Sequence, residues 1–265
     1  LILVFYGIIS YQLERGRQAS VEQELLRKVE RMTQVIDEKF STVDMIATQI
    51  ASSSWIRYAG AQSAILYSRM DTLKKQEISQ TIGNANDILK IAKSTAILFP
   101  RKNMAIDRVS FWECERYLNS VDLYPRLLYN LQTALEGNYS TQVLYTDDKV
   151  KAGYGNFIIV KQLKYDDKPS QILFVYVDGR LFEKFIKNNV SDTLHFVLTF
   201  DGNPVYEWNN GNVKESGEQI YAKTVPSGMY RWTYEFTVDM SYLNSGNQTA
   251  YFMLLGCAGF LILAF

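Results

Sequence analysis

Six residues in the middle of the chain have side chains of the kind that line a small-molecule pocket. Such sites usually combine aromatic walls with a few convergent polar groups. If the chain has a ligand pocket, we expect these residues to line it: Trp112, Arg116, Tyr124, Arg126, Tyr145 and Asp178. The chemistry would then be non-covalent recognition of a small molecule.

Each of these types also has an interpretation that needs no ligand, and it is the commoner one. Trp112 and Tyr124 suit a hydrophobic core, whereas Arg116 and Arg126 suit solvated helix faces. Asp178 follows an apolar stretch and precedes LFEKFIKN. We therefore expect its local role to be the N-cap of a short helix, where its carboxylate accepts backbone N–H groups.

The chain shows no catalytic constellation. It contains no G-x-S-x-G, H-E-x-x-H, Walker A or G-x-G-x-x-G sequence. The G-x-G of Gly153 and Gly155 opens an expected strand and is not a phosphate loop. The acidic pairs at 147–148 and 166–167 are turn residues by context. We expect neither enzymatic activity nor a cofactor, and an anchored extracytoplasmic enzyme is the least favoured alternative.

Metal ligands and disulfides are not indicated either. The single histidine, His195, lies in TLHFVLTF, which alternates like a strand, and we interpret it as an ordinary strand residue. The two cysteines are Cys114 and Cys257, and the second sits inside a terminal apolar run. We therefore expect no disulfide and no metal site, because zinc sites need clustered Cys and His ligands.

The overall composition is that of a globular protein. The 265 residues include 28 basic and 28 acidic side chains, and the mean hydropathy is −0.13. A zero net charge argues against nucleic-acid binding, because phosphate recognition needs a basic face.

Both ends of the chain are apolar. Residues 1–11 and 248–265 contain LILVFYGII and YFMLLGCAGFLILAF. Each run is shorter than the roughly 20 residues of a transmembrane helix, so we interpret them as the end of a first span and the start of a second. The alternatives are a signal peptide and a buried core helix. With two spans, the residues between them lie on one side of the membrane, which the charge pattern does not identify.

A long helix is expected directly after the first run. Between Gln18 and Ser54 apolar residues recur in steps of three or four, as on one helix face. The stripe consists of Leu25, Val29, Met32, Ile36, Phe40, Val43, Ala47 and Ile50. A helix of about 40 residues is roughly 60 Å long. The stripe must pack on the folded domain, on a partner copy as in a coiled coil, or on both.

Two groups of strands are expected after this helix. A second helix at 64–81 is expected to break at Gly83-Asn84, and 87–100 then reads as extended. FWECERYLN and LYPRLLYNLQTALEG read as short helices. Three strands follow, of which ILFVYV is apolar at every position and predicts a central strand, with KYDDKPS as a hairpin turn. A smaller strand group begins near His195, after a linker at 188–192.

Four stretches carry a resemblance to a known family. They are VEQELLRKVERMTQVIDEKFSTVDMIATQIASSSWI, LKIAKSTAILFPRKNMAID, QILFVYVDGRLFEKFI, and FDGNPVYEWN together with SGMYRWTYEFTVDMSYL. In this order they resemble the double Cache extracytoplasmic sensor domain of bacterial transmembrane receptors. The resemblance implies an α+β fold, with a long N-terminal helix and two PAS-like antiparallel-sheet modules between two transmembrane helices.

The resemblance also implies domain boundaries. The first span would end at residue 11, and the signalling helix would cover 12–55. The membrane-distal module would cover 56–188 and the membrane-proximal module 189–247, with the second span starting at 248.

The finer resemblance concerns the output and the ligand. ILFPRKNMAI and VDMIATQIASS look most like sensors of membrane-bound AraC-type transcription regulators, and sensors of two-component histidine kinases are similar. FWECERY matches only part of the pattern of amino-acid-binding sensors, so no amino-acid ligand is implied. The implied partners are an unknown small molecule or a solute-binding protein, the membrane, and a second copy in a homodimer. A non-sensing, partner-binding ectodomain is the other alternative.

Overall fold

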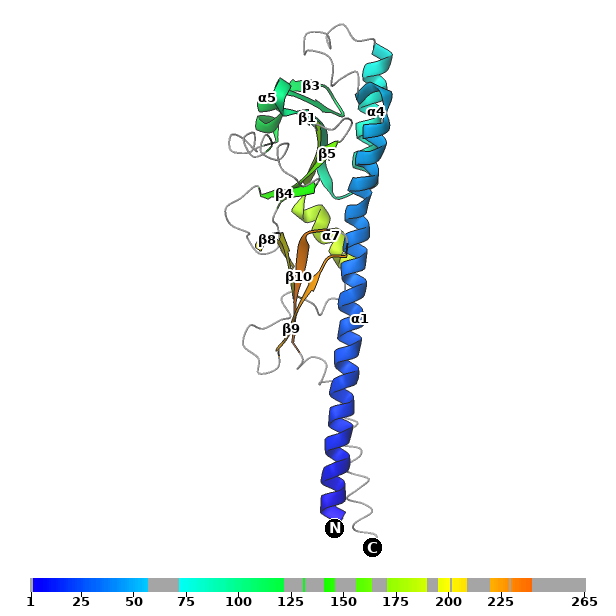
Figure 1. The fold of residues 1–265 in the computed structure, drawn as a ribbon, viewed down its shortest axis with the longest axis vertical. Helices are drawn as coiled ribbons and strands as arrows, with labels where there is room; N and C mark the ends of the chain where they lie inside the picture. Colours follow the sequence, from blue (N-terminus) through cyan, green and yellow to red (C-terminus); the bar gives the residue numbers. More distant parts are fainter. Residues whose placement is uncertain are drawn as a thin grey trace.

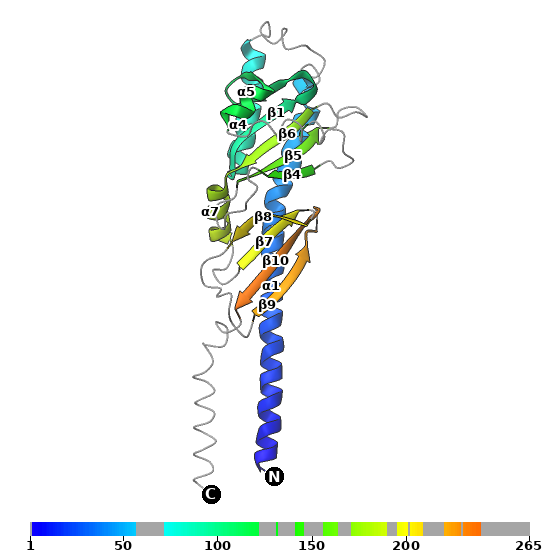
Figure 2. The same cartoon turned by 90° about the vertical axis from the view of Figure 1, so that its left-hand side faces the viewer.

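The chain folds into two antiparallel sheets arranged beside one long helix. The computed structural model describes residues 2–56, 72–121, 131, 141–145, 156–163, 171–189, 195–200, 202–208, 220–228 and 230–239. Figure 1 shows the sheets one above the other along the helix, and Figure 2 shows their strands laid across it. The six-stranded sheet lies toward the C-terminal end of the helix, and the four-stranded sheet lies nearer its N-terminal end. This confirms the α+β class with a long N-terminal helix.

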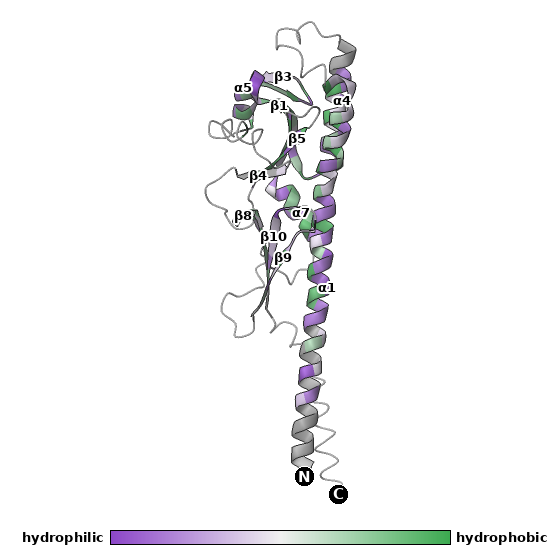
Figure 3. Cartoon of the chain, in the orientation of Figure 1, coloured by the Kyte–Doolittle hydropathy of each residue, from purple (hydrophilic) through white to green (hydrophobic). Residues whose placement is uncertain are grey.

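The long helix α1 spans Ile2–Ser52, a length of 51 residues. All the predicted stripe residues, from Leu25 to Ile50, are buried, and none is more than 3% exposed. Polar and apolar residues alternate along the helix, as the colours in Figure 3 show. Because the stripe belongs to the same hydrophobic core as residues of both sheets, it packs on the folded domain of its own chain.

The expected membrane spans fall at the two ends of the chain. Within the described residues, α1 included, no helix combines the length and apolar character needed to cross a bilayer. The expected start of a second span at 248–265 lies outside the described residues.

The larger sheet has the strand order β3-β2-β1-β6-β5-β4, and all its neighbours are antiparallel. Its strands are β1 (Ala92–Phe99), β2 (Met104–Asp107), β3 (Phe111–Glu113), β4 (Thr141–Tyr145), β5 (Phe157–Leu163) and β6 (Gln171–Val177). A single 3₁₀ turn, η1 (Pro100–Lys102), joins β1 to β2. All seven residues of β6 are buried, which confirms the predicted central strand.

Helices cover both faces of the larger sheet. On one face, residues such as Ile97, Ile159 and Val175 belong to the core shared with α1 and with α4 (Thr72–Leu89). On the other face, a separate core forms under α5 (Cys114–Ser120). Because β6 contributes side chains to both cores, it is apolar at both parities.

The expected helix break at Gly83-Asn84 is wrong, and so is the extended interpretation of residues 87–89. Helix α4 continues through Gly83 to Leu89. Ile78, Ile82, Ala85 and Leu89 are all buried, so the apolar stripe continues past the glycine and tertiary packing overrides its low helix propensity. The Arg108 side chain lies over Gly83, 3.4 Å from where a Cβ would stand.

The helix expected over FWECERYLN also begins later than predicted. Residues 111–113 form the edge strand β3, in which Trp112 pairs with Ala105, and α5 starts at Cys114. Aromatic residues such as Phe111 and Trp112 fit a pleated, half-buried surface, and a stretch of three residues carries too little periodicity to separate strand from helix.

The smaller sheet has the strand order β8-β7-β10-β9. Its strands are β7 (His195–Phe200), β8 (Asn203–Trp208), β9 (Ile220–Pro226) and β10 (Trp232–Asp239), as the sequence predicted. Helix α7 (Gly179–Asn189) follows β6 and leads toward this sheet. The two sheets fall within the expected module ranges 56–188 and 189–247, and the turn KYDDKPS and most of the expected linker lie outside the described residues.

Candidate functional site

The face of the larger sheet under α5, called here the α5 face, has an apolar floor and a polar corner. The floor consists of buried side chains from four strands together with the inward side of α5: Ala96, Leu98, Ala105, Cys114, Tyr117, Leu118, Ile158, Val160, Ile172, Phe174 and Tyr176. These side chains are at most 4% exposed and form a packed core, so the groups available to a ligand on this face are the polar ones at its edge.

The polar corner lies where β1 begins and β6 ends. Its residues are Lys93, Ser94, Tyr117, Asn156 and Tyr176. A β-bulge between Ala92 and Ser94 places Lys93 outside the regular ladder. Lys93 Nζ lies 5.1 Å from the centroid of the Tyr176 ring. A bulge commonly redirects a side chain in this way, and here it brings an ammonium group over an aromatic face.

Hydroxyl and amide groups complete the corner. Ser94 Oγ and Tyr117 Oη share a hydrogen bond of 2.7 Å. Asn156 Nδ2 donates to Tyr176 Oη at 3.1 Å, and Asn156 Oδ1 accepts from the Gly179 N–H at 2.9 Å. Asn156 therefore ties the phenol of Tyr176 to the first residue of α7.

Asp178 caps the helix that leaves this corner. Its Oδ1 accepts the backbone N–H groups of Arg180 at 2.8 Å and Leu181 at 3.1 Å. This confirms the N-cap role expected from sequence. The backbone of Asp178 also donates to Ile91 O at 3.0 Å, which fixes the start of α7 against the approach to β1.

The electrostatics of the α5 face favour recognition over acid–base chemistry. Burial raises the pKa of Tyr117 well above its usual value, even though the hydrogen bond from Ser94 opposes the shift. Burial also raises the pKa of the Cys114 thiol to about 12, and Cys114 Sγ donates to Met104 O at 2.9 Å. Both groups therefore stay protonated near neutral pH, and Cys114 is not a poised nucleophile.

The structure separates the candidate residues that it describes. Across the sheet, Trp112 pairs with Ala105, Ala105 with Leu98, and Leu98 with Ile172, so Trp112 is level with the start of β6. Asp178 follows the other end of β6. Six residues of strand extend about 20 Å, so Trp112 and Asp178 do not share one small pocket.

The candidate residues also differ in their surroundings. Trp112 is half-buried against the α5-face core, and its buried indole Nε1 has no hydrogen-bond acceptor among the residues that the structure describes. Arg116 is exposed on α5. The backbone of Tyr145 is level with Val177, near the polar corner, but its side chain lies outside the described residues. Tyr124 and Arg126 also lie outside them.

Sequence analysis missed all the residues of the polar corner. Tyr176 carried a usable signal, since it lies two residues before Asp178, and a strand places such residues on the same side. Lys93 carried no usable signal, because its position depends on a β-bulge that the residue types around it do not predict.

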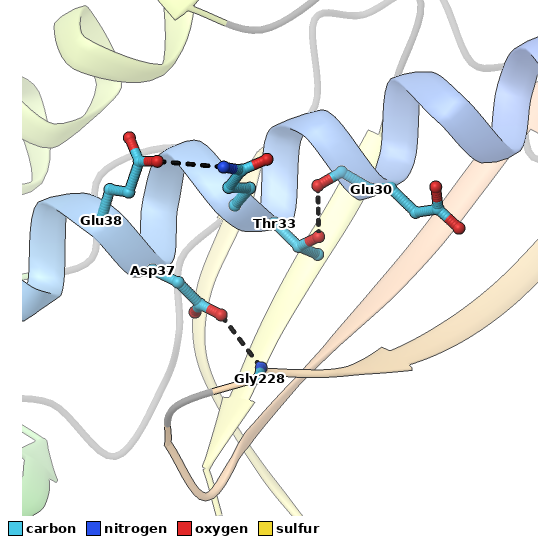
Figure 4. Close-up of a pocket in the computed structure, with 6 residues that line it drawn as sticks. Glu30, Thr33, Asp37, Glu38 and Gly228 are labelled. Atoms are coloured by element: carbon cyan, nitrogen blue, oxygen red, sulfur yellow. Dashed lines mark hydrogen bonds between the residues drawn. The ribbon is translucent and has the colours of Figure 1, made fainter.

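A second group of missed residues lies on α1. Asp37 is only 6% exposed, and its carboxylate binds the turn between β9 and β10. Oδ1 accepts from Ser227 Oγ at 2.8 Å and from Tyr234 Oη at 2.6 Å, and Oδ2 accepts the Gly228 N–H at 3.1 Å. Figure 4 shows the Asp37 side chain pointing from α1 toward Gly228.

Asp44, two helical turns further along, contacts both sheets. Tyr230 Oη, next to β10, donates to its Oδ2 at 3.0 Å. Lys161 Nζ, on β5, lies 2.8 Å from its Oδ1. Burial raises the pKa of Tyr230, and the charge of Asp44 adds to this shift. Burial likewise raises the pKa of Tyr234, and its hydrogen bond to Asp37 adds to it. Both phenols therefore remain donors.

These two carboxylates also had a signal in the sequence. Asp37 and Asp44 are seven residues apart, and each directly follows a stripe residue, Ile36 or Val43. On a helix this spacing returns to the same side after two turns. A carboxylate next to an apolar stripe must find partners when the stripe is buried.

An open hollow of about 410 Å³ lies beside Asp37, lined by Glu30, Thr33, Gln34, Asp37, Glu38 and Gly228. Figure 4 shows its three carboxylates pointing in different directions. In the part of the chain that the structure describes, no three His, Cys, Asp or Glu side chains are grouped so as to hold a metal ion.

Comparison with known proteins identifies solved structures with a similar architecture. No family model and no curated protein sequence matches the chain. The extracellular domain of rpHK1S-Z16, a protein assigned as a histidine kinase, is 12% identical to it with a TM-score of 0.50, covering 86% of this chain and 99% of that domain. The chain therefore shares its fold with this extracellular domain.

Two further solved structures are similar at lower scores. The ligand-binding domain of the Campylobacter jejuni chemoreceptor Tlp3, in complex with L-valine, is 12% identical over 86% of this chain and 97% of that one, with a TM-score of 0.47. The sensor domain of the V. cholerae histidine kinase DctB is 10% identical over 84% of this chain and 98% of that one, also with a TM-score of 0.47. The long N-terminal helix and the two antiparallel sheets agree with the fold that the sequence resemblance implied.

Proposed function

We propose that the chain is the extracytoplasmic sensor region of a transmembrane signalling receptor, of the double Cache kind. It binds a small molecule, or a solute-binding protein, on the module of the larger sheet and relays the signal to a cytoplasmic output. The observation that carries the proposal is the fold shared with the extracellular domain of a protein assigned as a histidine kinase, which extends over 86% of this chain. Membrane spans at the two ends and a homodimeric assembly are parts of the same proposal, and we propose no catalytic activity for this region.

The α5 face is the proposed binding site. It offers the ammonium group of Lys93 and the hydroxyl and amide groups around Tyr117 and Tyr176, at the edge of an apolar core. This combination suits a small polar molecule such as a sugar, an amino acid or a carboxylate, because aromatic faces bind the apolar side of a ligand while polar groups fix its orientation. Asp178 is engaged as a helix cap, so the charge-bearing group that we assign to the ligand is Lys93.

For the output we propose an AraC-type DNA-binding regulator, with a two-component histidine kinase as the alternative. The AraC proposal rests on the sequence resemblance of residues 97–106 and 43–53. The kinase alternative fits at least as well, because the extracellular domain with the TM-score of 0.50 belongs to a protein assigned as a kinase. The residues that follow the second apolar run in the gene decide between the two.

A thermal-shift screen of the 265-residue chain against sugars, amino acids and carboxylates tests the proposal. A ligand at 100 times its Kd stabilises a protein by about 2.7 kcal/mol, which is measurable as a rise in Tm. We expect at least one class to raise the Tm, and Lys93→Met to abolish that rise. Lys28→Met is the matched control, because Lys28 pairs with the exposed Glu24 one turn away on α1, far from the polar corner in the sequence.

Two outcomes would overturn direct sensing. If no compound raises the Tm and the chain instead binds a purified solute-binding protein, the partner-binding alternative holds. If a compound raises the Tm equally in the wild type and in Lys93→Met, the binding site is not the polar corner.

A further inference from the structure

We propose that Asp44 is a switchable connection between the two modules, which passes a displacement of β5 in the larger sheet to the turn that precedes β10 in the smaller sheet. The inference concerns how the modules are linked. It does not require a ligand, so it can fail or succeed independently of the proposed function.

The geometry divides the Asp44 carboxylate between the two sheets. Oδ1 faces Lys161 Nζ at 2.8 Å, and Oδ2 accepts from Tyr230 Oη at 3.0 Å. Lys161 Nζ also donates to Thr141 Oγ1 on β4 at 2.9 Å. On the side of the larger sheet, Asp44 is contacted by Lys161 of β5, which is itself held by Thr141 of β4. On the side of the smaller sheet, the same carboxylate is contacted by the Tyr230 hydroxyl.

Burial makes this connection stronger than an ordinary surface pair. The Lys161 side chain is 17% exposed and the Asp44 side chain is 35% exposed. Partly desolvated charges interact more strongly than exposed ones, and removing one partner leaves the other charge poorly compensated. A movement of β5 that separates Lys161 from Asp44 therefore removes the positive charge that balances the carboxylate to which Tyr230 donates.

The turn between β9 and β10 is positioned to respond. Tyr230 packs edge-to-face on Trp232, with ring centroids 5.0 Å apart, and Trp232 begins β10. The same turn is also bound by Asp37, through Ser227 and Gly228. Among the contacts described for these two carboxylates, only those of Asp44 include the larger sheet. Asp37 thus anchors the turn to α1, and Asp44 connects it to the other module.

Amide hydrogen exchange of the full chain, read by mass spectrometry, tests the connection. Lys161→Met removes the charge on β5 and preserves most of the side-chain volume. We expect exchange in residues 220–239 of the smaller sheet to rise by about threefold or more, although Lys161 belongs to the larger sheet. Lys28→Met is the control, because the 3.0 Å pair of Lys28 with Glu24 lies within one turn of α1.

The reciprocal change makes the test specific. Tyr230→Phe keeps the ring on Trp232 and removes the hydroxyl. Since coupling between sites is reciprocal, exchange in β4 and β5 should then rise. The double variant should show less than the product of the two single effects, because both act through Asp44.

Three results would overturn the proposal. One is a rise confined to the larger sheet in Lys161→Met. Another is multiplicative single effects in the double variant. The third is an equal rise in all segments with loss of far-UV circular dichroism, since that would indicate general unfolding and not communication between modules.

Discussion

Phe40 of α1 and Trp232 of β10 pack with their ring centroids 4.2 Å apart. Phe40 also lies 6.2 Å from the Phe157 ring of β5 and 5.7 Å from the Phe182 ring of α7. One side chain of the long helix therefore contacts both sheets and the helix that joins them. This cluster is the packing counterpart of the polar contacts at Asp44, one helical turn away.

Phe40→Ala should destabilise the chain strongly. The side chain is 1% exposed, and removing a buried phenylalanine costs about 3–5 kcal/mol through lost contacts and the cavity left behind. Urea unfolding followed by tryptophan fluorescence measures this loss. Met45→Ala is the control, because Met45 is 53% exposed on the same helix and should change the stability little. Similar losses for the two variants would contradict the central role of Phe40.

Tyr234→Phe removes the shortest described hydrogen bond to the buried Asp37 carboxylate, 2.6 Å long. Hydrogen bonds to charged groups contribute about 1.5–3 kcal/mol, so we expect a loss of this size in the free energy of unfolding. Ser227 and Gly228 still bind Asp37 in the variant, which should keep the turn folded. Tyr11→Phe serves as the control, since Tyr11 is 64% exposed. A neutral effect at Tyr234 would contradict this assignment.

Stability should fall at alkaline pH because of the same tyrosine. The folded state holds the pKa of Tyr234 above its unfolded value of about 10. Above pH 10 the unfolded chain therefore binds fewer protons than the folded one, so the stabilisation is complete below pH 10 and is lost as the pH rises further. Each such group contributes up to about 1.4 kcal/mol per pH unit. Urea midpoints between pH 8 and 11 measure the decline, which should be shallower in Tyr234→Phe.

Cys114 should resist alkylation until the chain unfolds. Its thiol is fully buried, with a pKa of about 12 against a usual 9.0. The thiolate fraction at pH 8 is then lower by about a thousandfold, and thiolate is the reactive form. Iodoacetamide labelling of a Cys257→Ser variant, with and without urea, measures the difference. Rapid labelling without urea would show that α5 opens readily.

Asp178 permits a separation of capping from ligand binding. Asp178→Ala should cost about 0.5–2 kcal/mol, whereas Asp178→Asn should cost little, because asparagine caps helices equally well. Both are measured by urea unfolding. In the ligand screen, Asp178→Asn should keep the Tm rise, because we assign the ligand's charged group to Lys93. If Asp178→Asn is stable but shows no rise in Tm with the ligand, Asp178 itself contacts the ligand.

The sequence predicted the elements whose burial follows a simple pattern. The stripe from Leu25 to Ile50 has the 3.6-residue period of a helix, which predicts α1. The run 172–177 is apolar throughout, which predicts the central strand β6. Gly83 was misread because its helix propensity was weighed without the core that Ile82 and Ala85 help to form. Local preference is weak evidence where tertiary packing decides.

The candidate site was less predictable. Trp112 and Asp178 have suitable side chains, yet strand pairing places them at opposite ends of β6. Lys93 depends on a bulge, and Asp44 depends on two partners distant in the sequence, Lys161 and Tyr230. Residue types indicate what chemistry is available, whereas register and long-range pairing determine which groups meet.

Phe40 divides the long helix into two arms of very different length. Asp44 lies about 6 Å along the axis from Phe40, and Ile2 lies about 57 Å away in the other direction, at 1.5 Å per residue. If the helix moves as a rigid rod about Phe40, a sideways shift of about 0.5 Å at Asp44 tilts it by about 5°, which displaces its first turn by about 5 Å. A rearrangement smaller than a bond length between the sheets is thereby magnified roughly tenfold at the N-terminal end of α1.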